Sequence, residues 1–553
     1  MSTGLDQTTV QAQAWLAADP DLQTREQLAA LIAAAKQGES DAILELEDAF
    51  ATRLSFGTAG IRGALGPGPN RMNRVVVQQT AAGLASYLQA RGGGSVVIGH
   101  DARHRSADFA HDIAAVLAQS GLSAMVLPRA LPTPVLAFAL RWLGCAAGVM
   151  VTASHNPKRD NGIKVYLADG SQIVAPADTE ISAEIDKAAV ALHLLDEHVD
   201  AEWLTLDEQV IDAYIETALA LVAQSSARSM RCVYTAMHGV GGDLLARIFQ
   251  RAGFPAVLSV PEQLLPDPDF PTVAFPNPEE PGAMDLALAL AHANPVDLII
   301  ASDPDADRCA VGIPADTELG WRMLSGDEVG WLLGWWVLQR GKRGTLAQSL
   351  VSGSMLEAIA QSAGVGYEQT LTGFKWISRV PGLVFGYEEA LGYCVDPEHV
   401  RDKDGITAAL LFAELAASLQ AQGQTVQGLL DQLAREHGVY ATAQISVRLA
   451  NPALISKAMH ELRLHPPASV GGFAVLHVDD LEQPSDGLPP TDGLRFILEG
   501  GGRVIVRPSG TEPKVKCYLQ VVEAVDGPDI GLARQRAADA LVSISTDARE
   551  WLG

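Results

Sequence analysis

The chain has 553 residues, which at roughly 150 residues per domain corresponds to about three to four domains. Its 40 Lys and Arg against 66 Asp and Glu give a formal net charge of −26, and 48% of its residues are hydrophobic. This is the composition of a folded globular protein, and the acidic balance argues against nucleic acids or anionic membranes as partners.

Five cysteines are far apart and form no CxxC pair, which argues against a disulfide framework and a zinc site. We therefore expect a reducing, cytoplasmic location. An acidic stretch around Asp19 and Asp21 stands where a signal peptide needs a basic region and an apolar core. The most apolar stretches, 142–153 and 330–338, are shorter than the ~20 residues that span a bilayer. The sequence predicts a soluble protein.

The first 50 residues are predicted to be helical, because Trp15, Leu28 and Ile32 recur at helical spacing among Ala, Gln and Glu. The Gly-rich passage 56–73 is predicted to be a loop. Short apolar strands then alternate with helical stretches such as 109–119, a pattern that indicates a mostly parallel sheet. The predicted strands of this block are 96–98, 125–127 and 147–151.

The same alternation restarts twice along the chain. The second block holds a helix at 209–223 with strands at 231–235 and 296–300, and the third a helix at 328–338 with strands near Leu350 and Val384. The last block differs, because its strands follow one another before a closing helix, which indicates an antiparallel sheet. Its predicted strands are 444–447, 473–477, 493–498, 503–506 and 516–521.

The predicted fold class is α/β. We expect three similar α/β domains with mixed, mostly parallel sheets, followed by a C-terminal α+β domain with an antiparallel sheet. The predicted domains are residues 1–205, 206–320, 321–440 and 441–553.

The first polar segment of interest, 152–157, directly follows the strand at 147–151. Ligands gather at the carboxyl ends of strands in open α/β sheets, so Ser154 is a candidate nucleophile. The alternative is a polar turn with a capping serine. Lys164 adds a cation nearby, although a single lysine is more often on the surface.

The second segment carries Asp303, Asp305 and Asp307 at alternate positions after the strand at 296–300. At about 4 Å and an effective dielectric of about 20, each pair of like charges costs roughly 4 kcal/mol, so a bound cation is the economical explanation. The alternative is a solvated acidic loop. An EF-hand is excluded because Arg308 stands where its Gly is required, and oxygen ligands favour Mg²⁺ over zinc.

The third segment, 386–392, offers Glu388 and Glu389 as acceptors for two adjacent sugar hydroxyls, with an exposed acidic turn as the alternative. Shortly after it, Lys403 lies near Arg401 in the sequence, which would lower its proton affinity and suit it to acid/base work. A charged surface loop is the alternative there.

The fourth segment, 507–514, combines a guanidinium, two hydroxyls, a glycine and an ammonium, and this set suits a phosphate dianion. It is not a Walker A loop. An ordinary Pro/Gly turn is the alternative.

In this order and spacing the four segments resemble those of the α-D-phosphohexomutase family, and the resemblance covers nearly the whole chain. It implies a phosphorylated Ser154, with His155 beside it, and a Mg²⁺ loop of Asp303, Asp305 and Asp307. The segment 56–63 resembles the family's N-terminal signature and implies a catalytic role for Arg62. Proton transfer is implied for Lys164 and Lys403. The implied substrate-binding residues are Arg308, Lys375, Glu388, Glu389, His399, Arg507, Ser509, Gly510, Thr511 and Lys514.

Within the family, the chain is most similar to the phosphoglucomutase/phosphopentomutase branch. It departs from many relatives at Ala390, which replaces a Ser of the sugar loop. The resemblance implies four domains around a central cleft. It also implies a monomer or homodimer that acts on small sugar phosphates.

The implied reaction interconverts sugar 1-phosphate and sugar 6-phosphate through a phosphoserine and a bisphosphorylated sugar, with Mg²⁺ as cofactor and glucose 1,6-bisphosphate as primer. Glucose phosphates are the predicted substrates, with mannose or pentose phosphates as alternatives. A sugar-bisphosphate synthase, a silent sugar-phosphate sensor and a phosphatase are rival functions. The phosphatase is disfavoured because aspartyl-phosphate hydrolases need Thr or Val where Asp307 stands.

Overall fold

The computed structural model describes residues 2–58, 60–190, 202–448, 452–485, 487–508 and 514–551. The chain forms two compact units. The first unit comprises Met1–Met323 and Gly392–Glu414, and the second comprises Leu324–Leu391 and Leu415–Gly553.

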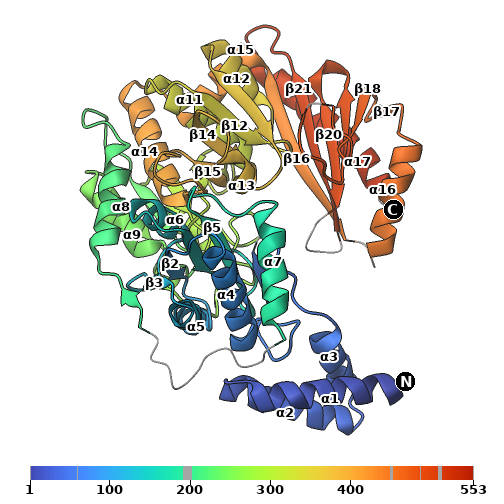
Figure 1. The fold of residues 1–553 in the computed structure, drawn as a ribbon. Coiled ribbons are helices and arrows are strands. Elements are labelled where there is room, and N and C mark those ends of the chain that lie inside the picture. The colour runs from blue at the N-terminus through green and yellow to red at the C-terminus, as the bar shows by residue number, and fades with distance from the viewer. Residues whose placement is uncertain are drawn as a thin grey trace. The chain divides into compact units, whose positions relative to one another are not determined.

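Three helices open the first unit, as the apolar spacing predicts. Trp15, Leu28 and Leu46, one from each helix, are buried and join the core of this unit. The second helix starts at a carboxylate cap, since the Asp21 side chain accepts a hydrogen bond from the Gln23 N–H. The helices are α1 (Ser2–Ala18), α2 (Leu22–Lys36) and α3 (Ser40–Ala51), in blue in Figure 1.

A six-stranded mixed sheet follows, in the order β1-β5-β4-β2-β3-β6. Strand β2 is parallel to β3 and β4, and β5 is antiparallel to β4 and β1. The strands are β1 (Ile61–Ala64), β2 (Ser95–His100), β3 (Ser123–Val126), β4 (Ala147–Val151), β5 (Asp160–Leu167) and β6 (Leu204–Thr205). The helices of this part are α4 (Arg74–Gln89), α5 (Ser106–Gln119), α6 (Thr133–Trp142) and α7 (Ala177–Ala188).

The predicted loop at 56–73 is wrong for Ile61–Ala64, which forms β1. Ile61 is buried and pairs with Ile163 of β5, so backbone hydrogen bonding outweighs the glycine-rich composition. Gly60 allows this approach, because it has φ +78° and a Cβ there would lie 1.8 Å from the Ile163 carbonyl oxygen.

The second sheet of the first unit has the order β11-β10-β9-β7-β8. Strands β7, β8 and β9 are parallel, and β10 runs antiparallel to both β9 and β11. The strands are β7 (Cys232–Thr235), β8 (Leu258–Ser259), β9 (Leu298–Ala301), β10 (Ala310–Pro314) and β11 (Trp321–Met323). The helices are α8 (Gln209–Ala220), α9 (Gly242–Arg251), η1 (Pro261–Gln263) and α10 (Asp285–Ala293). The short strand β15 (Gly392–Cys394) and the start of α14 (Gly405–Ala421) also belong to this unit.

The second unit contains the parallel strands β13-β12-β14 and then an antiparallel sheet. A capping box of Ser325 and Glu328 starts its first helix. The elements are α11 (Gly326–Gln339), β12 (Thr345–Ser349), α12 (Met355–Ala363), β13 (Gly366–Thr370), α13 (Phe374–Ile377), β14 (Leu383–Glu388) and α15 (Val426–His437). Strand β14 therefore extends into the segment 386–392.

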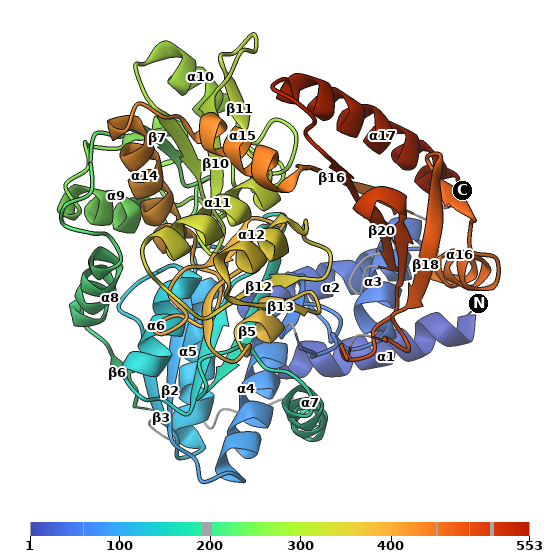
Figure 2. The same ribbon diagram turned by 90° about the horizontal axis from the view of Figure 1, so that it is seen from above.

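The antiparallel sheet has the order β16-β21-β20-β19-β18-β17, and α17 packs on it through Ala533 and Ala537 (Figure 2). Phe496 and Val504 lie in the same buried cluster. The elements are β16 (Val439–Arg448), α16 (Pro452–Leu464), β17 (Ser469–Val470), β18 (Phe473–Asp480), β19 (Leu494–Leu498), η2 (Glu499–Gly501), β20 (Arg503–Pro508), β21 (Lys514–Glu523) and α17 (Ile530–Glu550).

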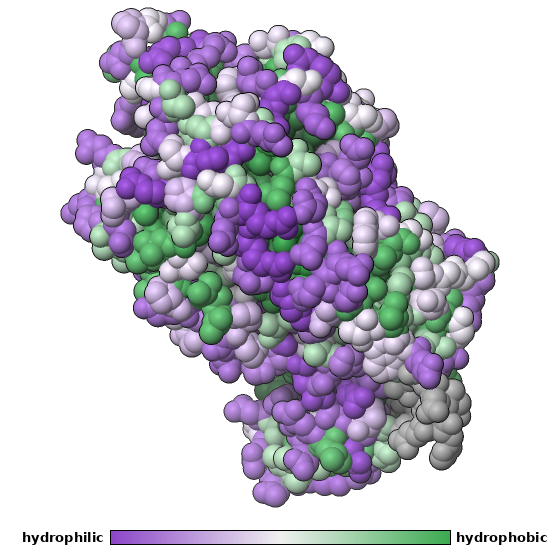
Figure 3. All heavy atoms as spheres, turned by 90° about the vertical axis from the view of Figure 1, so that its left-hand side faces the viewer, coloured by the Kyte–Doolittle hydropathy of each residue, from purple (hydrophilic) through white to green (hydrophobic). Residues whose placement is uncertain are grey.

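These sheets confirm the predicted fold class, three mixed α/β sheets and an antiparallel C-terminal sheet. The central cleft and the boundaries at 205, 320 and 440 stay predictions. Among the described residues, no helix has the length and apolar character to cross a membrane. On the face drawn in Figure 3, hydrophobic residues form separate small groups among hydrophilic ones.

Candidate functional site

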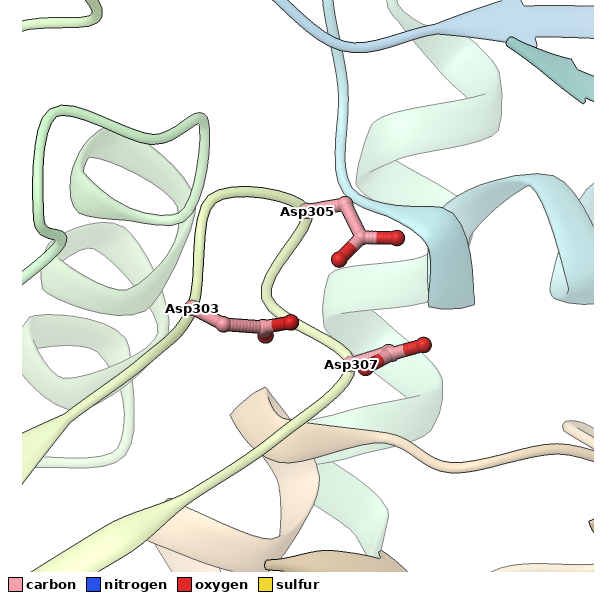
Figure 4. A group of neighbouring side chains, drawn as sticks. All are labelled: Asp303, Asp305 and Asp307. Atoms are coloured by element: carbon pink, nitrogen blue, oxygen red, sulfur yellow. The ribbon is translucent and has the colours of Figure 1, made fainter. Parts of the chain in front are cut away.

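Three aspartates are gathered on the loop that joins β9 to β10. The strand β9 is fully buried, and the loop turns back through Ala306, which has φ +52°. Asp303, Asp305 and Asp307 are each at most 1% exposed, and one carboxylate oxygen from each lies within 4.8 Å of the others. Figure 4 shows the three side chains on this single loop.

Each of the two later carboxylates has one oxygen held by the protein. Asp305 Oδ2 accepts hydrogen bonds from Thr133 Oγ1 at 2.6 Å and Lys164 Nζ at 2.7 Å. Asp307 Oδ2 accepts one from Lys164 Nζ at 2.8 Å and lies 3.3 Å from Lys403 Nζ. The buried Oδ1 atoms of both aspartates have no hydrogen-bond partner among the described residues. Two unpartnered anionic oxygens in a buried oxygen-only cluster fit a hard cation such as Mg²⁺.

The electrostatics of the cluster point the same way. Burial and repulsion from the other two carboxylates raise the pKa of Asp303 well above its usual range. Burial alone would also raise the pKa of Asp305, but the Lys164 ammonium and the Thr133 hydroxyl lower it below its usual range. Lys164 and Lys403 likewise lower the pKa of Asp307, although burial and Asp305 oppose them. The protein's own cations therefore favour the charged form of Asp305 and Asp307 but not that of Asp303.

Ser154 contacts this cluster from the loop after β4. Its Oγ donates to Asp303 Oδ2 at 2.8 Å, and Asp303 Oδ1 accepts the Arg308 N–H at 3.1 Å. The Thr152 hydroxyl accepts the Ser154 N–H at 2.9 Å, and Ser154 has the left-handed φ of +51°. A strand end thus presents a hydroxyl directly to the aspartates.

Two further predicted residues flank the serine. His155 Nδ1 lies 3.3 Å from Ser154 Oγ, and burial together with the Arg308 and Arg62 charges lowers the pKa of His155 well below its usual value. The imidazole is therefore neutral near pH 7. Arg62, on β1, donates to Asn156 Oδ1 at 3.0 Å.

The two predicted lysines both lie against the aspartates. Lys164 lies on β5 and is only 5% exposed, because its ammonium bridges Asp305 and Asp307. Burial opposes its charge, but these carboxylates outweigh burial and raise its pKa. Lys403 Nζ lies 3.3 Å from a carboxylate oxygen of Asp307 and 3.5 Å from one of Asp402. The lowered proton affinity expected from Arg401 stays a prediction.

The segment that carries Lys403 is attached to the aspartate loop. Gly392 forms an isolated β-bridge with Arg308, and the Gly405 N–H donates to the Ala306 carbonyl oxygen at 3.2 Å. His399 lies in the same segment, half-exposed, with its Nδ1 2.7 Å from Asp396 Oδ2. The first unit therefore brings together Ser154, the three aspartates, Lys164, Arg308 and Lys403 through direct contacts.

The remaining predicted residues belong to the second unit. Glu388 Oε1 accepts the Gly373 N–H at 2.6 Å, and Lys375 lies on the adjoining helix α13. Arg507, at the end of β20, donates to Thr372 Oγ1 in the same turn. Lys514 begins β21. The predicted phosphate contacts Ser509, Gly510 and Thr511 lie outside the described residues.

Glu389 differs from its neighbour Glu388. Its Oε2 accepts hydrogen bonds from the hydroxyls of Ser349 at 3.0 Å and Ser352 at 2.9 Å. Burial, together with the Glu388 charge, raises the pKa of Glu389 to about 7. One of its oxygens is thus engaged within the protein.

Two residues at the site, Thr133 and Arg103, belong to none of the predicted sequence motifs. Thr133 bonds Asp305 through its hydroxyl, and Arg103 donates to the Ser154 carbonyl oxygen at 2.6 Å. Both follow the carboxyl ends of strands that the sequence predicts, β3 and β2. That shared position is the signal that could have found them.

Comparisons with known proteins find a matching family model for each of four parts of the chain. Models of the phosphoglucomutase/phosphomannomutase family match residues 53–191 (alpha/beta/alpha domain I), 212–315 (domain II), 325–437 (domain III) and 446–529 (C-terminal domain). The chain belongs to this family.

A probable phosphomannomutase of Haemophilus influenzae is 49% identical over 455 residues, which cover 81% of this chain and 92% of that protein. A phosphoglucomutase of Staphylococcus haemolyticus is 36% identical over 504 residues, covering 86% and 91%. The crystal structure of a putative phosphomannomutase from Thermus thermophilus aligns with a TM-score of 0.70 at 25% identity, covering 90% of this chain and 99% of that one. The predicted family is confirmed, and the chain is a mutase-type enzyme of the phosphoglucomutase/phosphomannomutase family. The predicted branch within it stays a prediction.

Proposed function

We propose that this chain interconverts hexose 1-phosphates and hexose 6-phosphates by way of a phosphoserine at position 154. The observation that carries the proposal is the hydrogen bond from Ser154 Oγ to Asp303 Oδ2, in a buried cluster with two unpartnered carboxylate oxygens. A hydroxyl so placed suits phosphoryl transfer, because a phosphate there lies next to a cation site.

Asp303, Asp305 and Asp307 would hold Mg²⁺ together with the phosphate of Ser154. Bound there, the ion offsets the negative charge of the transferring phosphoryl group. The serine loop, residues 152–159, includes the neutral His155 and lies near the charged Arg62 and Arg308. We assign these three residues to hold that phosphate and the reacting end of the sugar.

The proposed reaction has two balanced halves. A sugar hydroxyl oxygen bonds to the phosphorus on Ser154, the bond from phosphorus to Ser154 Oγ breaks, and the hydroxyl loses its proton while the serine oxygen gains one. The bisphosphorylated sugar then turns, and its other phosphate returns to Ser154 by the reverse steps. Lys164 and Lys403 are the proposed proton carriers, since both ammonium groups lie against the cluster.

The remaining predicted residues are the proposed contacts to the rest of the substrate. Glu388, Glu389, Lys375 and His399 are assigned to the sugar. The non-reacting phosphate is assigned to Arg507, Ser509, Gly510, Thr511 and Lys514, and holding it positions the other end. Glucose 1,6-bisphosphate is the proposed primer. We keep glucose phosphates as the predicted substrates, although the relatives include a probable phosphomannomutase.

A panel of glucose, mannose and ribose 1-phosphates, with Mg²⁺ and glucose 1,6-bisphosphate, tests the proposal by phosphorus NMR. We expect the wild type to convert a hexose 1-phosphate into the hexose 6-phosphate with no net release of phosphate. We expect Ser154→Ala to form no 6-phosphate. Faster turnover of ribose 1-phosphate would assign the enzyme to pentoses. Accumulating bisphosphate would favour the synthase, and released inorganic phosphate would contradict a mutase.

A further inference from the structure

One guanidinium donates to four backbone carbonyl groups, three in the serine loop (residues 152–159) and one in the first residue of β5. Arg103 Nη2 donates to the carbonyl oxygens of Ser154 and Asn156, both at 2.6 Å. Its Nη1 donates to those of Pro157 at 2.9 Å and Asp160 at 3.3 Å. The side chain is almost fully buried, so these carbonyls replace water around the cation.

Arg103 is itself held in place from three sides. Asp101 Oδ1 accepts the Arg103 N–H at 3.0 Å and the Ser106 hydroxyl at 2.6 Å, and Asp101 Oδ2 lies 3.4 Å from Arg103 Nε. The guanidinium also lies over the Phe270 ring, 5.0 Å from its centroid. The donor therefore has a fixed position when the loop folds around it.

The serine loop needs such a donor. Residues 152–159 lie between β4 and β5 and belong to no helix or strand, so few of their carbonyl groups have partners from regular structure. Ser154 also has the left-handed φ of +51°, which costs a non-glycine residue roughly 1 kcal/mol or more. The bond from Arg103 to the Ser154 carbonyl oxygen acts on this residue directly.

The shape of the donor matters as well as its charge. A guanidinium presents its N–H groups in a planar fork, whereas an ammonium at the same place has three donors on one atom. Two nitrogens of Arg103 reach four carbonyls spread over 154–160. A lysine cannot reproduce that pattern.

We propose that Arg103 is a positioning residue, which fixes the backbone of residues 154–160 so that Ser154 Oγ faces Asp303. This inference rests on the proposed phosphoserine role of Ser154. It assigns to Asp101 the task of orienting Arg103, and it gives a role to a buried cation that donates to the backbone carbonyl groups of this loop.

The test compares Arg103→Lys and Arg103→Ala with the wild type in the full-length chain. Phosphate uptake onto Ser154 from glucose 1,6-bisphosphate is followed by intact mass, alongside kcat, KM, thermal unfolding and hydrogen exchange of residues 152–160. We expect both variants to lose about 100-fold in uptake rate and kcat, the effect of about 1 Å of misplacement, with KM nearly unchanged. Guanidinium ions should restore part of the Arg103→Ala rate. Arg129→Ala, on an exposed ion-pair network, is the control.

Faster hydrogen exchange confined to residues 152–160 in a folded Arg103→Lys variant supports positioning. Uptake within twofold of wild type in Arg103→Lys overturns it, whether or not Arg103→Ala folds. Unfolding of both variants also overturns it, because the role is then general stability. If the wild type itself takes up no phosphate, the proposed function fails instead, and hydrogen exchange still reports whether Arg103 orders the loop.

Discussion

The aspartates of the first unit, Asp303, Asp305 and Asp307, and the glutamate Glu389 of the second unit have opposite kinds of partners around their carboxylates. In the first unit, the ammonium groups of Lys164 and Lys403 lie against Asp305 and Asp307. Two buried carboxylate oxygens there have no hydrogen-bond partner in the part of the chain that the structure describes. In the second unit, Glu389 accepts bonds only from neutral hydroxyls among its described contacts, those of Ser349 and Ser352. The first arrangement keeps Asp305 and Asp307 ionised, whereas the second favours proton uptake by Glu389.

The pKa directions express this difference. Lys164 lowers the pKa of Asp305, although burial opposes it, whereas burial and the Glu388 charge raise the pKa of Glu389 to about 7. Burial is common to both sites, so the neighbours decide the outcome. Two ionised carboxylates that each keep an unpartnered oxygen, Asp305 and Asp307, suit a metal ion. A glutamate with neutral partners suits an uncharged, hydrogen-bonding ligand such as a sugar hydroxyl.

The largest expected effect comes from removing the hydroxyl of the first cluster. Ser154→Ala should abolish phosphate uptake and lower kcat by about 10⁴-fold or more, as loss of a nucleophile does. Intact mass and steady-state rates measure both. Ser352→Ala is the matched control, since its hydroxyl bonds Glu389 as that of Ser154 bonds Asp303, and it should still take up phosphate. Unchanged phosphorylation of Ser154→Ala would remove position 154 from the chemistry.

Asp305→Asn tests whether the first cluster holds the cation. It replaces a ligand oxygen and unbalances the Lys164 ion pair, so we expect the Mg²⁺ concentration for half-maximal activity to rise about 100-fold. Titration of activity with Mg²⁺ measures it. Asp269→Asn, at an exposed ion pair, should leave that concentration unchanged. An identical Mg²⁺ dependence in Asp305→Asn would exclude this carboxylate from the metal site.

Titration of Glu389, in the second unit, should make the stability of the protein depend on pH. Its pKa rises from 4.5 to about 7 on folding, so between those values the folded state keeps a proton that the unfolded state releases. The contribution of Glu389 to the free energy of unfolding should therefore fall by about 3 kcal/mol as pH rises through this window. Urea unfolding at pH 4.5 and pH 8 measures it.

Glu389→Gln removes this titration, so its stability relative to wild type should improve by that amount from pH 4.5 to pH 8. Glu368→Gln, at an exposed position of β13, is the control and should differ from wild type equally at both values. A constant difference between Glu389→Gln and wild type would show that Glu389 titrates normally.

The sequence alone predicted those features that depend on residues close to one another in the chain. Strands β2 and β4 were predicted because their sequences contain continuous apolar runs, and the structure buries residues 96–99 of β2 and the whole of β4. The aspartates were found because alternate positions on one short loop converge. Contacts between residues far apart in the sequence were not predicted by composition and spacing. Lys164 became a candidate only through the family resemblance, and β5 places it against Asp305, 141 positions away.

The same reason explains the other misses. Nothing near Glu389 in the sequence indicates that Ser349 and Ser352, about 40 positions earlier, engage one of its oxygens. Strand β1 was hidden by its glycines, since its partner β5 supplies the hydrogen bonds. Pairing between segments far apart in the chain is the information that composition and spacing lack.

The smallest expected effect comes from removing the Thr133 hydroxyl, which contacts Asp305. Its hydroxyl bonds Asp305 Oδ2 at 2.6 Å and its N–H bonds the Asp305 carbonyl oxygen at 2.9 Å, so it orients the carboxylate from outside the acidic loop. Thr133→Val removes only the hydroxyl at nearly constant volume, and we expect about 10-fold weaker Mg²⁺ binding, the lower end of losses when a ligand's partner is removed. Calorimetric Mg²⁺ titration measures it, and Thr133→Ser, which keeps the hydroxyl, should bind as wild type does. Equal affinity in Thr133→Val would mean that Lys164 alone orients Asp305.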